Sequence, residues 1–288
     1  TLADFRFTGM LRAIMSKHKN HKKSGKPAQK QARRGGASGN SDAWLFGTHA
    51  VLAALANPKR QCQRLAMAAQ SKDELEILAA EASQKGGHEG LIAEIRDKNE
   101  ISALLAPGAV HQGLALLTAP LPAPHIEDVC KRAETLDSAT VVVLDQATDP
   151  HNIGAVMRSA LAFGALAVIV QNRHAPDITG TLAKTASGAV ESLDYIKVTN
   201  LVRALEGLKD AGFWCLGLDG SATEPLDSID LPKKTALVLG AEGKGLRRLS
   251  LEACDLTAKI PMTAAMESLN LSVAAAVSLY EVFRRNKP

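Results

Sequence analysis

The chain has 288 residues, 46% of them hydrophobic, which is typical of a globular protein with one large or two smaller domains. No apolar run reaches the roughly 18 residues that a membrane-spanning helix needs, and the N-terminus lacks a secretory signal. Four widely spaced cysteines and eight scattered histidines exclude a zinc site or disulfide framework of ordinary spacing, so we expect a cytoplasmic protein. Because residue 1 is threonine, Met10 and Met15 are candidate start residues.

Charge is unevenly distributed along the chain. The net charge is +4, yet residues 1–42 hold ten Lys and Arg against two Asp, and this segment has no core-forming apolar pattern. We therefore predict a disordered basic arm over residues 1–42, which serves either as a solubilising tail or as an electrostatic contact to nucleic acid. Aromatic residues make up only 3% of the chain, so an RNA partner would be held through shape, phosphate and ribose rather than base stacking.

After the arm, apolar-periodic segments alternate with short apolar runs. This alternation predicts a small α/β domain over residues 43–118. A proline-rich linker over residues 119–138, which passes into a short helix, follows it. The expected elements of the small domain are a helix from Trp44 to about Asn57, strands over 62–69, 90–95 and 112–118, and helices over 72–86 and 98–108.

The β-α alternation resumes over residues 139–288 with more apolar strands. Continuous apolar strands separated by helices predict a parallel sheet that is covered on both faces. The expected strands are 140–145, 166–170, 213–219, 235–240 and 256–260.

The helix that follows the strand 140–145 carries a single arginine, Arg158. At about 100° per residue, Ile153, Val156, Met157, Ala160, Leu161 and Phe163 gather on one face, which we expect to be buried. Arg158 falls on a different face of small residues, without a carboxylate three or four positions away. Such a face lets a ligand or another backbone approach closely.

Three strand ends carry hydrogen-bonding residues without a metal-ligand cluster or a Ser-His-Asp arrangement. Asn152 precedes the Arg158 helix, where it either caps the helix or faces a site. Glu242 lies among Gly240, Gly243 and Gly245, whose spacing is neither a P-loop nor GxGxxG and fits either a ligand contact or a plain glycine turn. Ser268 and Asn270 precede a long apolar helix, where their side chains either cap the backbone or face a site; local geometry alone favours capping for Ser268.

The segments "DPHNIGAVMRSA", "LVLGAEGKGL" and "IPMTAAMESLNLSVAAA" resemble, in order and spacing, the three motifs of the SpoU (TrmH) RNA ribose 2′-O-methyltransferases of the SPOUT superfamily. The segments "FGTHAVLAAL" and "VHQGLALL" resemble the small substrate-binding domain of the branch that methylates a guanosine ribose in 23S ribosomal RNA. The resemblance covers residues 44–286. It implies an α/β fold with a parallel sheet and a C-terminal trefoil knot, preceded by a small α/β substrate-binding domain.

The resemblance also implies a cofactor and an assembly. S-adenosyl-L-methionine would lie in the knot, held mainly by backbone groups near Gly240, Gly243, Ile260, Met262 and Leu269, without a metal. The protein would be a homodimer, and the small-residue face around Arg158 would give the partner subunit a place to pack.

The catalytic residues that the resemblance implies are Arg158, Asn152, Glu242, Ser268 and Asn270. Arg158 would act on the ribose 2′-hydroxyl and the adjacent phosphate, either as a general base or by docking phosphate and stabilising the oxyanion. The other four would orient the arginine, the ribose and the cofactor. The expected substrate is 23S rRNA; the alternatives are a tRNA ribose methyltransferase of the same family and a non-catalytic ribosome-assembly factor that binds RNA.

Overall fold

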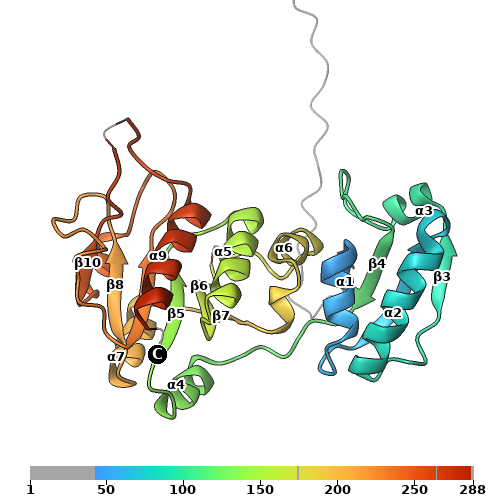
Figure 1. The fold of residues 1–288 in the computed structure, drawn as a ribbon, viewed down its shortest axis with the longest axis horizontal. Helices are drawn as coiled ribbons and strands as arrows, with labels where there is room; N and C mark the ends of the chain where they lie inside the picture. Colours follow the sequence, from blue (N-terminus) through green and yellow to red (C-terminus); the bar gives the residue numbers. More distant parts are fainter. Residues whose placement is uncertain (1–42, 174, 264, 287–288) are drawn as a thin grey trace, which may run out of the picture. The chain divides into compact units, whose positions relative to one another are not determined.

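The computed structural model describes residues 43–173, 175–263 and 265–286, which form two sheets (Figure 1). The predicted basic arm lies outside the described residues. No helix in the described ranges is both long enough and apolar enough to cross a membrane.

The smaller sheet has the strand order β1-β4-β2-β3, in which β2 and β3 are parallel and the other pairs are antiparallel. Its strands are β1 (Ala43–Phe46), β2 (Cys62–Ala68), β3 (Ala93–Arg96) and β4 (Leu114–Thr118). Its helical elements are α1 (Thr48–Leu55), η1 (Ala69–Ser71), α2 (Lys72–Gly86) and α3 (Lys98–Ala103).

The helix predicted from Trp44 is wrong in its first turn. Residues Ala43–Phe46 are a strand instead, in which Trp44 pairs with Leu117 of β4. Gly47, at φ 91°, turns the chain before α1 begins at Thr48. The sequence signal for this break was the glycine, since the left-handed region suits a residue without a side chain.

The larger sheet confirms the expected α/β fold with a parallel sheet. All five adjacent pairs are parallel in the order β10-β8-β9-β5-β6-β7. The strands are β5 (Ala139–Leu144), β6 (Ala167–Gln171), β7 (Asp194–Val198), β8 (Trp214–Leu218), β9 (Lys234–Leu239) and β10 (Leu256–Ala258). Sequence reasoning missed β7, whose polar residues suit an edge strand better than a buried one.

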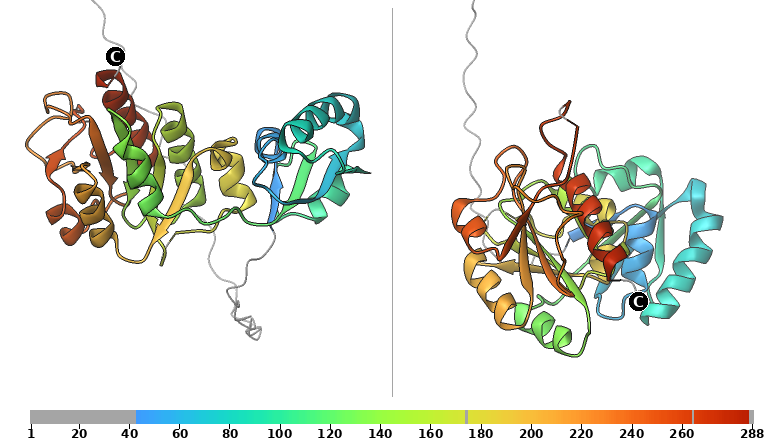
Figure 2. Two further views of the ribbon diagram at one scale, coloured as in Figure 1. Left: turned by 90° about the horizontal axis from the view of Figure 1, so that it is seen from below. Right: turned by 60° about the vertical axis from the view of Figure 1, so that its left-hand side comes forward.

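Helices cover both faces of the larger sheet (Figure 2). Val142 and Leu144 of β5 belong to the core beneath α5 and α9, whereas Val141 and Val143 belong to the core beneath α4 and α7. This alternation along one strand is the period of two that a sheet buried on both faces requires. The helical elements are α4 (Ile126–Glu134), α5 (Pro150–Ala162), α6 (Gly180–Ala186), η2 (Ala189–Glu191), α7 (Leu201–Asp210), α8 (Arg248–Glu252) and α9 (Leu271–Arg285).

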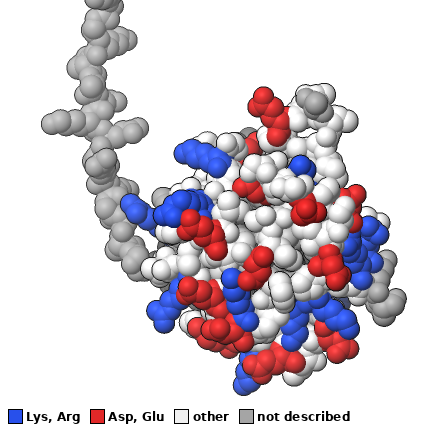
Figure 3. Space-filling view, turned by 90° about the vertical axis from the view of Figure 1, so that its left-hand side faces the viewer, with Lys and Arg blue, Asp and Glu red and all other residues white. Residues whose placement is uncertain are grey.

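Viewed from the side of β10, the surface carries basic and acidic side chains interspersed with one another (Figure 3). Ion pairs at this end of the sheet, such as Lys209 with Asp255 and Arg248 with Glu252, contribute to that mixture. Interspersed charges of both signs cancel at a distance. This face therefore offers little long-range attraction to a ligand of either charge.

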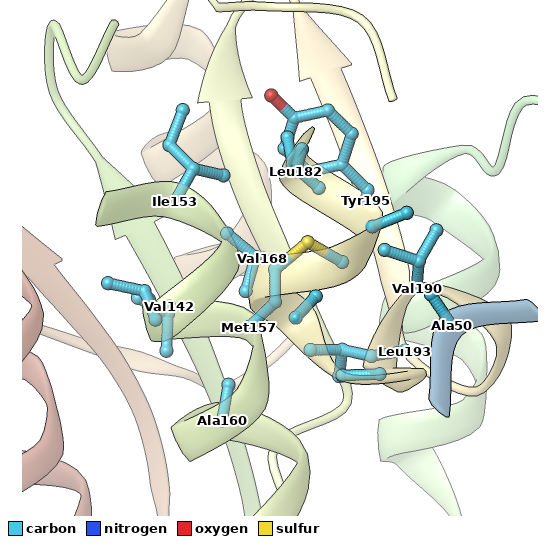
Figure 4. Close-up of a cluster of buried hydrophobic side chains, with 14 of the residues drawn as sticks. Ala50, Val142, Ile153, Met157, Ala160, Val168, Leu182, Val190, Leu193 and Tyr195 are labelled. Atoms are coloured by element: carbon cyan, nitrogen blue, oxygen red, sulfur yellow. The ribbon is translucent and has the colours of Figure 1, made fainter. Parts of the chain in front are cut away.

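Helix α5 is fixed to the sheet by its apolar face. Ile153, Met157 and Ala160 are fully buried and lie among Val142 and Val168 of the sheet (Figure 4). The expectation that Leu161 shares this burial is wrong, since it is 40% exposed. Ala160, one position earlier in the same turn of α5, is fully buried, so Leu161 lies at the border of the buried face.

Candidate functional site

Three side chains meet at the carboxyl edge of the larger sheet, beyond the strand ends. The Asn270 Nδ2 donates to Asn152 Oδ1 at 3.0 Å and lies 3.5 Å from Glu242 Oε2. Asn152 belongs to α5, Glu242 belongs to the loop after β9, and Asn270 directly precedes α9. The fold thus brings together three of the five residues predicted to be catalytic.

The Asn270 amide is oriented by its own helix. Its Oδ1 accepts the backbone N–H of Ser272 at 2.9 Å and the Ser272 hydroxyl at 2.7 Å, which makes Asn270 the N-cap of α9. Because Oδ1 is committed to these bonds, Nδ2 must face Asn152 and Glu242. The expected cap, Ser268, is wrong: α9 begins at Leu271, and an N-cap directly precedes the first helical residue.

Asn152 does not cap α5 either. The Asp149 Oδ1 accepts the backbone N–H of His151 at 3.0 Å, and Pro150 takes the first helical position. Proline is favoured there because its missing N–H would have no partner inside the helix. Asn152 lies in the first turn, where its side chain is available to Asn270.

Arg158 stands apart from the cluster. It is exposed and has no hydrogen bond or ion pair with any described residue. Six helical positions separate it from Asn152, which corresponds to about 9 Å along the axis and about 120° around it. A ligand that touches both residues must therefore extend along α5.

The small-residue face around Arg158 is already covered in part by the same chain. A Cβ on Gly154 would lie 2.8 Å from Leu182 O and 2.8 Å from Thr185 Cβ of α6. The glycine thus permits close packing of α5 on α6. The expectation that this part of the face receives a partner subunit is wrong at Gly154.

The loop after β9 folds tightly back on itself. A Cβ on Gly240 would lie 2.0 Å from the Gly245 carbonyl carbon, so only glycine fits at this point. Ala241 O accepts the backbone N–H of Gly245 at 2.9 Å, and Gly243 and Gly245 have φ values of 77° and 65°. The turn presents Glu242 on the surface at the sheet edge.

The segment between β10 and α9 leaves backbone polar groups without partners. Ile260, Met262 and Leu269 form no backbone hydrogen bond with other described residues. Ser268 is exposed and likewise has no hydrogen bond to a described side chain or backbone group. Unpaired backbone donors and acceptors are uncommon in proteins unless water or a ligand takes them. This segment can therefore hold a ligand through its main chain.

Sequence reasoning missed one charged pair at this edge. Asp145, directly after β5, is buried and pairs with Arg247 after the glycine loop. The available signal was an acidic residue that ends an apolar strand, since a buried carboxylate requires a partner. In the described ranges, no group of three or more His, Cys, Asp or Glu side chains could hold a metal ion.

Two family models match this chain. The SpoU rRNA Methylase family matches residues 139–280, and the family described as RNA 2′-O ribose methyltransferase substrate binding matches residues 44–124. The matched ranges contain the larger and the smaller sheet respectively.

Relatives with assigned names match over most of the chain. The 23S rRNA (guanosine-2′-O-)-methyltransferase RlmB of Photobacterium profundum is 38% identical over 248 residues, which cover 86% of this chain and 99% of the relative. The enzyme of that name from Pseudomonas aeruginosa is 42% identical over 182 residues, which cover 62% and 73%.

Solved structures share the fold. The SpoU methyltransferase AviRb from Streptomyces viridochromogenes, crystallised with the cofactor AdoMet, has a TM-score of 0.68 at 25% identity and covers 85% of this chain and 90% of its own. An AdoMet-bound rRNA methyltransferase from Sinorhizobium meliloti has a TM-score of 0.69 at 20% identity, with 86% and 88% covered.

Proposed function

We propose that this chain, which belongs to the SpoU (TrmH) family of RNA ribose 2′-O-methyltransferases, methylates the 2′-hydroxyl of a guanosine in 23S rRNA. The observation that carries the reaction is the meeting of Asn152, Glu242 and Asn270 at one amide group. The RlmB enzyme of Photobacterium profundum, 99% of whose length is matched by this chain, carries that activity in its name, which supports the choice of substrate.

The methyl donor that we propose is S-adenosyl-L-methionine, which supplies an already activated sulfonium methyl group. The residues present fit this molecule. The unpaired backbone groups of Ile260, Met262 and Leu269 suit a ligand that is recognised through the main chain. In the tight turn after β9, Gly240 makes room for Gly245, whereas nothing lies within 4 Å of a Cβ on Gly243, so a ligand can approach the backbone closely there.

Catalysis then depends on positioning and on charge. Asn270 holds Asn152 and Glu242 in one arrangement, which orients the ribose and the methionine end of the cofactor. Arg158 binds the phosphate next to the target nucleotide and stabilises negative charge on the 2′-oxygen through its guanidinium N–H groups, while the 2′-hydroxyl proton passes to solvent water. Ser268, exposed beside this cluster in the chain, supplies a further hydroxyl to the substrate or the cofactor.

We propose that the protein is a homodimer. Val273, Val277 and Tyr280 of α9 are 46%, 42% and 54% exposed, and they recur at the spacing of one helix face. Leu161 on α5, which packs against α9, adds to this apolar surface. A second copy of the chain would cover it, because contiguous apolar surface favours association.

We also propose that the C-terminal segment forms a trefoil knot. Support comes from the connection between β8 and β9: Leu226 N donates to Lys259 O at 2.8 Å, and Lys259 N donates to Glu224 O at 3.0 Å. The segment around Lys259 thus pairs with this connection, and α9, which follows it in the chain, packs against α5.

We propose that the smaller sheet selects the RNA and that the basic arm attracts it.

The substrate is tested by mapping ribose methylation in total RNA from cells with and without the gene. We expect one guanosine in 23S rRNA to lose its methyl group in the deletion strain. Loss of a methyl group from tRNA instead would favour the tRNA enzyme, and an unchanged methylation map would favour the non-catalytic assembly factor.

Calorimetry with S-adenosylmethionine in the presence of a chelator tests the proposed cofactor, and absence of binding would contradict the proposal.

The basic arm has its own test. Removal of residues 1–42 should weaken RNA binding and make the dependence of log K on log salt shallower, by about 0.7 to 0.9 per lost phosphate contact. The methylated nucleotide should remain the same, because phosphate contacts carry no sequence information. An unchanged salt slope would identify the arm as a solubilising tail.

A further inference from the structure

We infer that Asp145 is a positioning residue that sets the Glu242 loop relative to Asn152 and so determines the geometry of methyl transfer. The inference rests on the proposed function. Asp145 is not one of the residues that meet at Asn270; it acts through the loop that carries one of them.

Asp145 binds both ends of the glycine loop. Its backbone N–H donates to Leu239 O at 2.8 Å, at the residue where β9 ends. Its Oδ2 accepts the backbone N–H of Arg247 at 3.1 Å, directly after the loop. Its Oδ1 accepts the Arg247 Nε at 2.7 Å and forms an ion pair with Arg247 Nη2, also at 2.7 Å. Residues 240–246 are thus held closed at both ends by one residue.

The ion pair between Asp145 and Arg247 is largely buried. The Asp145 side chain is 0% exposed, and the Arg247 side chain is 38% exposed. A carboxylate out of contact with water requires pairing, which two hydrogen bonds and an ion pair with a single residue, Arg247, supply here. The contact therefore tolerates little displacement of the loop.

Asp145 also leads directly into the segment that carries Asn152. Gln146 has a φ of 62°, Ala147 is buried, and Asp149 caps α5. The same residue therefore fixes the Glu242 loop and begins the turn to Asn152. Asn270 contacts Asn152 at 3.0 Å and Glu242 at 3.5 Å, so a shift between these two segments would break one contact or the other.

Replacing Asp145 with Asn tests the inference. The amide keeps the size of the side chain but removes the charge, and only one of its two side-chain atoms can accept from Arg247. We expect kcat to fall by about tenfold to a hundredfold and KM for S-adenosylmethionine to rise, because displacement by about 1 Å is costly for a positioned reaction. Arg247→Lys, which retains one charged donor, should lose less activity than Arg247→Ala.

Two further measurements separate positioning from general stability. Asp145→Asn combined with Arg247→Ala should be no slower than the slower single variant, because both changes remove one contact. The matched control is Asp255→Asn: that carboxylate accepts the Cys215 N–H at 2.8 Å and Lys209 Nζ at 2.8 Å at the opposite edge of the sheet. This control should lower Tm and leave kcat and KM unchanged.

Hydrogen exchange provides a readout that does not require activity. Asp145→Asn should accelerate exchange in residues 241–247, and Asp255→Asn should not. Wild-type kinetics and wild-type exchange in the Asp145 variant would overturn the inference. If the unmodified protein transfers no methyl group to RNA, the proposed function fails, and the exchange comparison still decides whether Asp145 fixes the loop.

Discussion

The two edges of the larger sheet differ in how completely their polar groups are paired within the protein. At the amino edge, Asp255 binds both Lys209 and the Cys215 N–H, and Arg132 pairs with Asp194 at the start of β7. At the carboxyl edge, Asp145 is paired with Arg247, but Ser268 and, about 9 Å along α5 from Asn152, Arg158 have no partner among the described residues. Polar groups that lack partners in the protein are available to a ligand. The comparison indicates that the amino edge contributes stability and the carboxyl edge contributes function.

The largest effect is expected for Arg158→Ala. The side chain has no partner to lose among the described residues, and alanine is the better helix former, so folding and cofactor binding should persist. Methyl transfer should fall by about two orders of magnitude or more, the scale of a lost charge-stabilising group. Single-turnover methylation at saturating RNA measures it. Arg158→Lys should restore only part of the rate, because a point charge lacks the planar fork.

Near-normal turnover of the Arg158→Ala enzyme would contradict the conclusion that the unpaired polar groups serve a ligand. The arginine would then be an ordinary surface charge, and the open carboxyl edge would need a different explanation. Circular dichroism and calorimetry with the demethylated cofactor establish that the variant is folded and can bind.

Asn270 separates the cap from the site. Asn270→Asp keeps an oxygen that accepts the Ser272 N–H but loses the donor to Asn152 and places a second carboxylate beside Glu242. We expect methyl transfer to fall by about tenfold to a hundredfold while the free energy of unfolding changes little. Asn270→Ala should lose the activity and also about 1 kcal/mol of stability, because the cap is gone. Equal stability losses in the two variants would contradict this division.

Two glycines, one packed against a neighbouring helix and one exposed, test how closely α5 packs on α6. Gly154→Ala should lower the free energy of unfolding by about 1 to 3 kcal/mol, since the added methyl group meets Leu182 O at 2.8 Å. Gly207→Ala on α7 is the control: nothing lies within 4 Å of its Cβ, so stability should rise by about 0.5 to 1 kcal/mol. Urea denaturation measures both. Equal effects would show that α5 and α6 can separate without cost.

A further effect on stability is expected at the amino edge in alkali. Burial, with a further contribution from Asp255, raises the pKa of the Cys215 thiol from 9.0 to about 12. The folded protein therefore keeps this proton between pH 9 and 12, where the unfolded chain releases it. Stability should fall as pH rises through that window. Unfolding under reducing conditions should show a weaker decline in Cys215→Ala; an identical decline would contradict the shift.

The sequence predicted the larger sheet better than its borders. The segments at 140–145 and 235–240 are almost continuously apolar, so their place in a buried parallel sheet followed from composition, although their pairing with each other did not. The strand at Asp194–Val198 escaped because Asp194 and Lys197 make it resemble a loop. Helix α6 also escaped, because its seven small and polar residues have no apolar period.

Helix caps could not be chosen from local sequence. Asp149 and Asn152, three positions apart, are both good cap residues, and so are Ser268 and Asn270, two positions apart. Tertiary contact decides between them: Asn270 reaches Asn152 from 118 positions away, which uses the Asn152 side chain elsewhere. The motifs predicted Asn152, Glu242 and Asn270, which the fold brings together, whereas the ion pair of Asp145 with Arg247 could be found only once the strand order was known.

The central position of β5 has a consequence for how the protein is made. β5 pairs with β6, about twenty-five residues later, but also with β9, so that Ala139 lies opposite Lys234. Pairings between residues so far apart in sequence form slowly, because a long loop must close first. During synthesis β5 and α5 emerge while β9 and α9 do not yet exist. We expect a nascent chain to hold Asn152 and Arg158 long before Glu242 and Asn270 can join them, so methyl transfer cannot begin on an RNA that contacts the chain as it is translated.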